Sequence, residues 1–346
     1  MSFILLFSLC IPLHGEVSPG VKKDNLNYMD CIILGVVEGI TEYLPISSTG
    51  HLLITNEFLG LNQETPVGFY LSKPNIDLKP ETNNKKSFPV ESPYTLKEAA
   101  FAYIIIIQAG AILAVIFLYR VTIFHIFLGL VGKKPKGLKL GLLILMSFLP
   151  AAILGLALNN WIENQLGDHL IAIAIALFLG AILMLYTDSK RKKMNSESQI
   201  SFKSSDAKNN ADRAINELDQ LNYKQALFIG FAQCLALWPG MSRSMVTIVG
   251  GYWIGLSPKK AAEYSFLLGL ITLSAASAYT LTTDGALLIK NMPIAPMIAG
   301  CIVAFISATY AIRFLVSCLN RYGLAPFAWY RIALALFLAL FFLAKS

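Results

Sequence analysis

Residues 34–52 read LGVVEGITEYLPISSTGHL. It begins as an apolar helix, carries Glu38 and Glu42 four residues apart, and breaks at Pro45 before a run of hydroxyl side chains. Carboxylates at i and i+4 lie on one face of a helix. A charged side chain at the middle of a bilayer costs roughly 2.5–3.5 kcal/mol even on the more lenient scale. The stretch therefore predicts a polar functional site inside an apolar protein.

The overall composition is that of a membrane protein. Of 346 residues, 55% are hydrophobic and only 14% are charged, whereas a soluble domain carries about a quarter charged residues. The net charge of +7 comes from short basic clusters between apolar segments, which is typical of membrane orientation signals and gives no indication of nucleic acid as a partner. The five cysteines show no disulfide or metal spacing, so we interpret them as small core residues. We expect an all-α polytopic membrane protein.

Eight apolar segments of about membrane-spanning length divide the chain. They cover residues 31–54, 98–119, 138–158, 169–187, 223–254, 264–282, 293–316 and 327–344. The polar stretches 56–97 and 188–222 are expected to be soluble loops, the second of them cytoplasmic. Residues 1–30 form an N-terminal extension, whose apolar stretch SFILLFSLCIPL fits either a signal segment or an interfacial one.

The first and fifth apolar segments resemble each other, which indicates an internal repeat. Gly35, Glu38, Pro45, Ser47 and Ser48 are matched about 195 residues later by Gly230, Gln233, Pro239, Ser242 and Ser244, with a one-residue slip near the proline. The repeat divides the chain into a first membrane half, 31–187, and a second, 223–346. Internal repeats in membrane proteins point to a site at the interface of the two halves.

The basic residues indicate the topology. Residues 120–139 carry basic side chains and no acid, so they should face the cytoplasm, as should KRKK at 190–193. The basic residues of the second half lie on that same side only if the fifth segment enters the membrane and turns back; they are Lys259, Lys260, Arg313 and Arg321. By the repeat, the first segment is also re-entrant. This predicts an inverted-topology repeat with about six spanning helices, two re-entrant segments that meet near the bilayer centre, and both termini outside.

The first motif supplies a candidate cation site and a candidate nucleophile. Glu38 and Glu42 suit a cation site, or a metal with a general base, and Mg²⁺ or Ca²⁺ prefer such oxygen ligands and also bind phosphate. The alternative is that one carboxylate, Glu38 rather than Glu42, is protonated and only hydrogen-bonded. Ser48 and His51 can approach each other across one turn, as nucleophile and base or as a histidine nucleophile with a serine partner. Helix capping is the structural alternative for the hydroxyl residues.

The second motif, PGMSRSMVT, places Arg243 in a membrane segment, where it needs an anionic partner. That partner is either Glu38 or Glu42 in a structural ion pair, or a phosphate, whose oxygens match the guanidinium fork. Hydroxyl residues of the two motifs would add donors to a phosphate, and they are Ser47, Thr49, Ser242, Ser244 and Thr247. Cation, nucleophile, base and phosphate clamp together predict phosphoryl transfer on a lipid phosphate.

The stretches EGITEYLPISSTGH (38–51) and PGMSRSMVTI (239–248) resemble the two signature motifs of the bacterial undecaprenyl-diphosphatase family, also known as bacitracin-resistance proteins. The resemblance covers most of residues 31–344. It implies a multi-pass hydrolase of the bacterial inner membrane with an outward-facing site and a divalent-cation requirement. Such an enzyme removes the terminal phosphate of undecaprenyl diphosphate and so recycles the carrier lipid for peptidoglycan synthesis.

Site roles carry over from the family by motif. Glu38 and Glu42 become the acidic pair, and Arg243 becomes the pyrophosphate ligand. Ser48 and His51 become the candidates for the nucleophile and its partner. The polar stretches 56–97 and 188–222 look longer than the family pattern, but neither touches a motif.

Two other functions fit the same pattern of residues. Inverted repeats with broken helices and midplane charges are also typical of secondary transporters, and a phosphotransferase would pass the phosphate to an acceptor other than water. The pair Ser48 and His51 favours an enzyme, because a pure carrier needs no nucleophile. The expected partners are the lipid diphosphate and membrane lipid. The sequence leaves the oligomeric state open, with a homodimer as one alternative.

Overall fold

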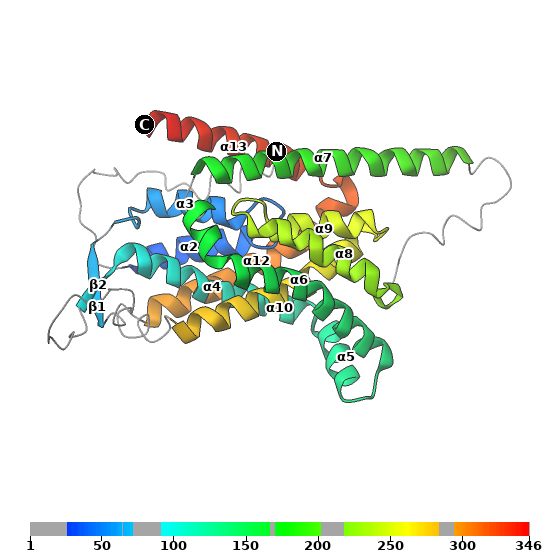
Figure 1. Cartoon of the computed structure of the whole chain (residues 1–346), viewed down its shortest axis with the longest axis horizontal. Helices are drawn as coiled ribbons and strands as arrows, with labels where there is room; N and C mark the ends of the chain where they lie inside the picture. Colours follow the sequence, from blue (N-terminus) through cyan, green and yellow to red (C-terminus); the bar gives the residue numbers. More distant parts are fainter. Residues whose placement is uncertain are drawn as a thin grey trace, which may run out of the picture.

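The computed structural model describes residues 26–63, 65–71, 91–166, 170–201, 218–283 and 294–345. The extension expected at 1–30 therefore lies almost entirely outside the described residues. The described chain is helical apart from one short two-stranded ribbon (Figure 1). In chain order its helices are α2 (Tyr28–Thr41), α3 (Ser48–Phe58), α4 (Leu96–Leu118), α5 (Arg120–Leu130), α6 (Pro135–Leu166), α7 (Leu170–Ser201), α8 (Tyr223–Cys234), α9 (Arg243–Trp253), α10 (Pro258–Thr283), α12 (Ile294–Tyr322) and α13 (Ala325–Lys345).

The described part of the chain contains five helices that are long and apolar enough to cross a membrane. These are α4, most of α6, α7 and α10, and α12. The sequence places its sixth crossing on helix α13, which has a shorter apolar part, Ala325–Phe341, and packs along α7 (Figure 1). The expected all-α polytopic membrane architecture is confirmed.

Each segment that the charge pattern marks as re-entrant is a pair of short helices with a break between them. Helices α2 and α8 begin with the same capping box, in which Asn27 or Asn222 accepts a hydrogen bond from the residue three positions on. Helices α3 and α9 both follow a serine with positive φ, Ser47 at 73° and Ser242 at 71°. The described residues contain no other non-glycine with positive φ. Local backbone geometry is thus repeated at the two breaks.

The structural repeat corrects one pairing made from the sequence. A spacing of 195 residues joins the caps at 27 and 222 and the serines at 47 and 242. With that spacing Ser48 corresponds to Arg243 and not to Ser244, since both Ser48 and Arg243 are the first residues of their helices. Only the prolines depart from the spacing of 195 residues: the position equivalent to Pro45 is Gly240, and Pro239 lies one residue earlier.

The two halves exchange partners in the bundle. Helix α2 of the first half packs on α12 of the second, and α8 of the second half packs on α6 of the first. Likewise α4 packs on α12 and α10 packs on α6, while α7 and α13 pack on each other. This reciprocal set of contacts is what a two-fold internal repeat produces, and it brings both breaks to the interface between the halves.

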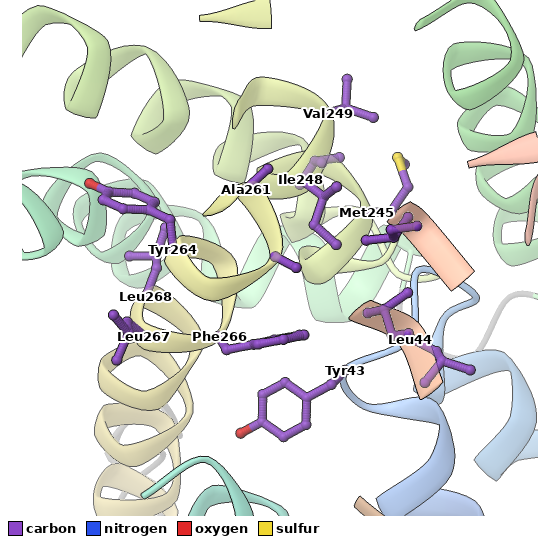
Figure 2. Close-up of a cluster of buried hydrophobic side chains, with 14 of the residues drawn as sticks. Tyr43, Leu44, Met245, Ile248, Val249, Ala261, Tyr264, Phe266, Leu267 and Leu268 are labelled. Carbon is purple, nitrogen blue, oxygen red and sulfur yellow. The ribbon is translucent and has the colours of Figure 1, made fainter. Parts of the chain in front are cut away.

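The largest hydrophobic core surrounds these breaks. It includes Tyr43 and Leu44 from the first break, with residues of α9 and α10 such as Met245 and Phe266 (Figure 2). The rings of Tyr43 and Phe266 meet edge to face with their centroids 5.5 Å apart, a favoured arrangement for aromatic pairs. Packing against two helices of the other half fixes the first break in place.

Three stretches expected to be loops contain regular structure. Residues 120–130 form α5, which packs on the start of α6 as a hairpin that projects from the bundle (Figure 1). Helix α7 continues past the membrane segment to Ser201, with Lys192 paired to Asp188 one turn earlier. Strands β1 (Pro66–Leu71) and β2 (Glu91–Thr95) form an antiparallel ribbon within 56–97. The two helical stretches contain no interior proline, and the prolines of 56–97 prevent a helix there without preventing a two-stranded ribbon.

Candidate active site

Glu42 is the centre of the polar cluster at the first break. It caps the C-terminus of α2, and its two carboxylate oxygens have different partners. Oε2 accepts a 2.7 Å hydrogen bond from the Ser48 hydroxyl, and Oε1 lies 2.9 Å from Nη2 of Arg243. Both side chains of the ion pair are about nine-tenths buried. The structure therefore links the Ser48 hydroxyl, the Glu42 carboxylate and the Arg243 guanidinium into one hydrogen-bonded chain, Ser48–Glu42–Arg243, which crosses the interface between the halves.

Arg243 is held on three sides but keeps unused donors. Nη1 donates to the backbone oxygen of Ser265 at 3.2 Å, and the guanidinium lies over the Tyr43 ring at 5.5 Å, a cation–π distance. Its Nε is buried and has no partner among the described residues. Because Gly269 has no side chain, the guanidinium lies directly against α10, where a Cβ at that position would overlap Nη1. Arg243 is thus pre-positioned and keeps a donor that no described residue uses.

The hydroxyl residues of the two motifs divide into caps and cross-links. Ser47 accepts from the Gly50 N–H and Ser242 from the Met245 N–H, so both cap helices, as the structural alternative proposed. Ser244 donates to the Leu44 carbonyl at 2.9 Å, which ties the second motif to the first.

Two threonines complete the set of predicted phosphate-binding residues. Thr247 is buried, donates to the Arg243 carbonyl at 2.9 Å and lies 2.7 Å from the Ser265 hydroxyl. Its hydroxyl therefore points toward α10. Thr49 is exposed in the first turn of α3. Of the five hydroxyl residues predicted to bind phosphate, Thr49 is the most accessible.

The ring nitrogens of His51 contact two groups other than the Ser48 hydroxyl, the partner that the sequence suggested. Nδ1 of His51 lies 2.6 Å from the Ser47 carbonyl oxygen, and Nε2 lies 2.6 Å from the Tyr330 hydroxyl. The Tyr330 ring stacks on the imidazole with an interplanar angle of 4°. A helical side chain leans back toward the preceding turn, which brings the imidazole to the Ser47 carbonyl and leaves the Ser48 hydroxyl to Glu42.

Glu38 lies one turn before Glu42 and is 1% exposed. Both of its carboxylate oxygens are buried without a hydrogen bond in the described part of the molecule. Gln108 of α4 is a polar neighbour of Glu38; its amide oxygen accepts from the Ser277 hydroxyl, which leaves its amide N–H groups as the ones that can face a carboxylate. The counterpart of Glu38 in the repeat, Gln233, also has a buried amide nitrogen without a partner. Buried polar groups are almost always satisfied, so this cluster fits a bound cation, proton or water.

Sequence reasoning missed the contribution of α13. Tyr330 and Arg331 both reach the breaks, and neither belongs to a motif. A signal was present, because an arginine within the last apolar segment is itself a mark of function. Tyr43 and Gly269 were missed for another reason, since aromatic and glycine residues are common in membrane helices and reveal a role only through contacts.

Fold and site together define an integral membrane protein with two broken helix pairs and a buried polar cluster between them. The chain belongs to the bacitracin resistance protein BacA family, whose model matches residues 31–337. It is 37% identical over 309 residues to an undecaprenyl-diphosphatase of Sorangium cellulosum, covering 89% of this chain and 84% of that protein. Undecaprenyl-diphosphatases of Ectopseudomonas mendocina and Geobacillus thermodenitrificans are 37% and 34% identical, covering 90% and 97% of their own lengths.

Proposed function

We infer that this protein hydrolyses undecaprenyl diphosphate to undecaprenyl phosphate and inorganic phosphate. The reaction returns the carrier lipid to peptidoglycan synthesis and underlies bacitracin resistance. The observation that carries the inference is the chain Ser48–Glu42–Arg243, assembled between two helix N-termini in a protein whose relatives bear the name of this enzyme.

The diphosphate would bind where α3 and α9 begin. The N-terminus of a helix carries unpaired N–H groups and a positive partial charge, which favour a phosphate. Arg243 would supply the buried Nε–H that lacks a partner, and its pairing with Glu42 would be exchanged in part for the more highly charged diphosphate. Thr49, Ser242 and Ser47 lie at the same two helix ends and would contribute hydroxyl or backbone donors.

Ser48 is our candidate nucleophile, with Glu42 as its base. The Ser48 oxygen would attack the terminal phosphorus while its proton passes to Glu42 Oε2, the atom that it already contacts. The bond from phosphorus to the bridging oxygen breaks, and undecaprenyl phosphate leaves with the proton that Glu42 took from Ser48, so that Glu42 is a carboxylate again. Water would then attack the phosphoserine and give its proton to Glu42. The bond from phosphorus to the Ser48 oxygen breaks, Ser48 regains its proton from Glu42, and inorganic phosphate is released. His51 would act by holding the first turn of α3 and not as the base.

A divalent cation fits the acidic pair. Glu38 offers two buried oxygens without hydrogen-bond partners, and Mg²⁺ or Ca²⁺ takes carboxylate oxygens together with phosphate and water. The described residues hold no cluster of three or more His, Cys, Asp or Glu side chains, so the remaining ligands would come from the substrate and solvent. When bound, the cation would neutralise part of the diphosphate charge.

We further propose the bacterial inner membrane as the location, with the site open to the exterior. The support is the distribution of basic residues, which favours the cytoplasm for residues 120–139 and 190–193. One chain supplies every residue of the site, so a homodimer, where it forms, is not needed to complete it.

A direct assay tests the proposed function. Purified protein in liposomes is given undecaprenyl diphosphate with Mg²⁺ or Ca²⁺, and released phosphate is measured. We expect turnover by the wild type and a loss of roughly 10²–10⁴-fold in Glu42→Gln, because the amide keeps the shape but cannot accept the Ser48 proton. Arg243→Lys should lose roughly 10²-fold, since lysine lacks the planar fork.

Arg313→Lys is the matched control, because Arg313 is exposed on α12 and the substitution makes the same chemical change away from the site. Normal turnover in Arg243→Lys would contradict the phosphate clamp. Lipid transport without phosphate release by the wild type would favour the transporter alternative, and phosphate passed to an acceptor other than water would favour the phosphotransferase.

A further inference from the structure

Arg331 of α13 is the largest side chain that the described residues bury completely. Its guanidinium donates to four backbone oxygens. Nε reaches Leu177 at 3.1 Å, Nη2 reaches Ala176 and Gly240 at 3.1 Å each, and Nη1 reaches Pro45 at 3.5 Å. No carboxylate in the described part of the chain forms an ion pair with it. Burying a charge without a counter-ion is costly, so its retention calls for a reason beyond packing.

The two buried arginines of the site differ in what they can still bind. A guanidinium has five N–H groups, and Arg331 uses four of them on carbonyls. Arg243 pairs with one carboxylate and one carbonyl and keeps a buried Nε without a partner. Arg243 is therefore equipped to bind a ligand, whereas Arg331 is nearly saturated by protein and suits a role in holding other groups.

The groups that Arg331 holds are the two breaks themselves. Pro45 and Gly240 are 195 residues apart and occupy the same position in the two halves, each two residues before the serine that caps the next helix. One guanidinium thus joins equivalent carbonyls of both halves, and Leu177 anchors it to α7. Gly180 leaves the space for this arrangement, because a Cβ there would overlap Nη2 of Arg331.

The neighbouring residue Tyr330 contacts His51, near the start of α3 and just after the first break. A carbonyl oxygen can only accept, so Nδ1 of His51 must carry the proton that it shares with Ser47. In the neutral ring Nε2 is then the acceptor and the Tyr330 hydroxyl is the donor. The Ser47 carbonyl therefore sets the tautomer, and Tyr330 holds Nε2 and, by stacking, the plane of the imidazole.

We propose that Tyr330 and Arg331 are positioning residues for the reaction: Arg331 sets the distance between the two breaks, and Tyr330 locks His51 against the carbonyl of Ser47. Neither touches the Ser48–Glu42–Arg243 chain directly. Through the breaks they fix how the half that carries Ser48 and Glu42 faces the half that carries Arg243. The kinetic part of the proposal rests on the proposed function, while the structural part does not.

Kinetics of Arg331→Lys separate positioning from stability. The ammonium group of lysine cannot reach carbonyls on three separate segments. We expect kcat per folded molecule to fall at least tenfold while KM changes less than threefold, because Arg331 does not contact the substrate. Arg243→Lys should raise KM in addition to lowering turnover, because Arg243 is proposed to bind the diphosphate. Turnover is normalised to the monodisperse, folded fraction, and the thermal unfolding midpoint is measured in parallel.

Gly180→Ala gives a second route to the same answer if Arg331→Lys fails to fold. The added methyl group displaces the guanidinium but keeps its charge, so the same loss of kcat is expected. Gly155→Ala on α6 is its control, because a Cβ at that position meets only the flexible end of Leu237 at 3.3 Å. If both site variants keep the kcat of their controls, Arg331 serves stability alone and the kinetic part of the proposal is wrong.

Nitrogen NMR of histidine-labelled protein tests Tyr330 without any assay of activity. We expect the wild-type His51 signals to show a protonated Nδ1 and an unprotonated Nε2, assigned by their loss in His51→Gln. Tyr330→Phe removes the donor to Nε2, so the Nε2 signal should shift while Nδ1 stays protonated on the Ser47 carbonyl. A wild-type His51 protonated on Nε2, or signals unchanged in Tyr330→Phe, would overturn this role. If the wild type releases no phosphate, the proposed function fails, and these spectra still decide the positioning of His51.

Discussion

At the scale of single residues, Arg243 depends on a glycine from another helix. Gly269 of α10 leaves room for Nη1, while the Tyr43 ring on another side of the guanidinium limits its movement. The arginine can therefore hold Glu42 and present its free Nε in one fixed orientation. Pre-organised donors of this kind stabilise charge in the transition state without reorganising during the reaction.

Gly269→Ala should consequently damage activity more than stability. Alanine favours a helix over glycine by about 1 kcal/mol, which offsets part of the overpacking cost of roughly 1–3 kcal/mol. We expect turnover to fall about tenfold or more with a shift of only a few degrees in the unfolding midpoint, as measured by phosphate release and thermal unfolding. Equal turnover in Gly269→Ala and Gly155→Ala would show that Arg243 moves aside freely.

Residue types could be predicted from the sequence, but several partners could not. The cost of buried charge singled out Glu38, Glu42 and Arg243, and the structure brings Glu42 and Arg243 into contact. The partner of Ser48 depended on where α3 begins, because a helix that starts at Ser48 turns its hydroxyl toward Glu42. No spacing rule contains that information, and Tyr330 lies 279 residues from His51 in the chain.

At the scale of elements, the two serine caps combine a hydrogen bond with a strained backbone. Ser47 and Ser242 have φ near +70°, a conformation that costs a residue with a side chain roughly 1–3 kcal/mol. Such strain is found where the surrounding structure over-determines the backbone. Here it allows α3 and α9 to start abruptly at the interface and to direct their N-termini toward the same place.

Substitutions at Ser242 should separate the cap from the strain. Ser242→Ala loses the cap, which costs about 0.5–2 kcal/mol, and keeps the strain. Ser242→Gly also loses the cap but relieves the strain, so we expect it to unfold at a higher temperature than the alanine variant. Thermal unfolding of both proteins makes the comparison. The same midpoint in both would mean that the backbone at this position is not strained.

Apolar length located the membrane helices well, whereas polarity was a poor guide to the segments between them. Helix α5 and the end of α7 are regular because their sequences lack interior prolines, and a helix already begun is cheap to extend. The ribbon of β1 and β2 depends on pairing between segments about 20 residues apart, which a reading of local composition cannot detect.

At the scale of the whole molecule, the inverted repeat makes a prediction about sidedness. Tyr28 and Tyr223 are equivalent residues at the starts of α2 and α8, and both are exposed. If the halves are inverted, they lie on opposite sides of the membrane. In a background without native cysteines, Tyr28→Cys should react with an impermeant maleimide in intact cells, and Tyr223→Cys only after permeabilisation. Labelling of both from outside would contradict the inverted topology.

The repeated backbone carries a set of side chains that is not repeated. Glu38 is matched by Gln233 and His51 by Val246, while Arg243 stands where the first half has Ser48. If the two halves carried the same reactive side chains, phosphate could be released on either side of the membrane. Because each half keeps only its own portion of the reactive groups, the proposed reaction has a direction in space, and its phosphate reaches a single compartment.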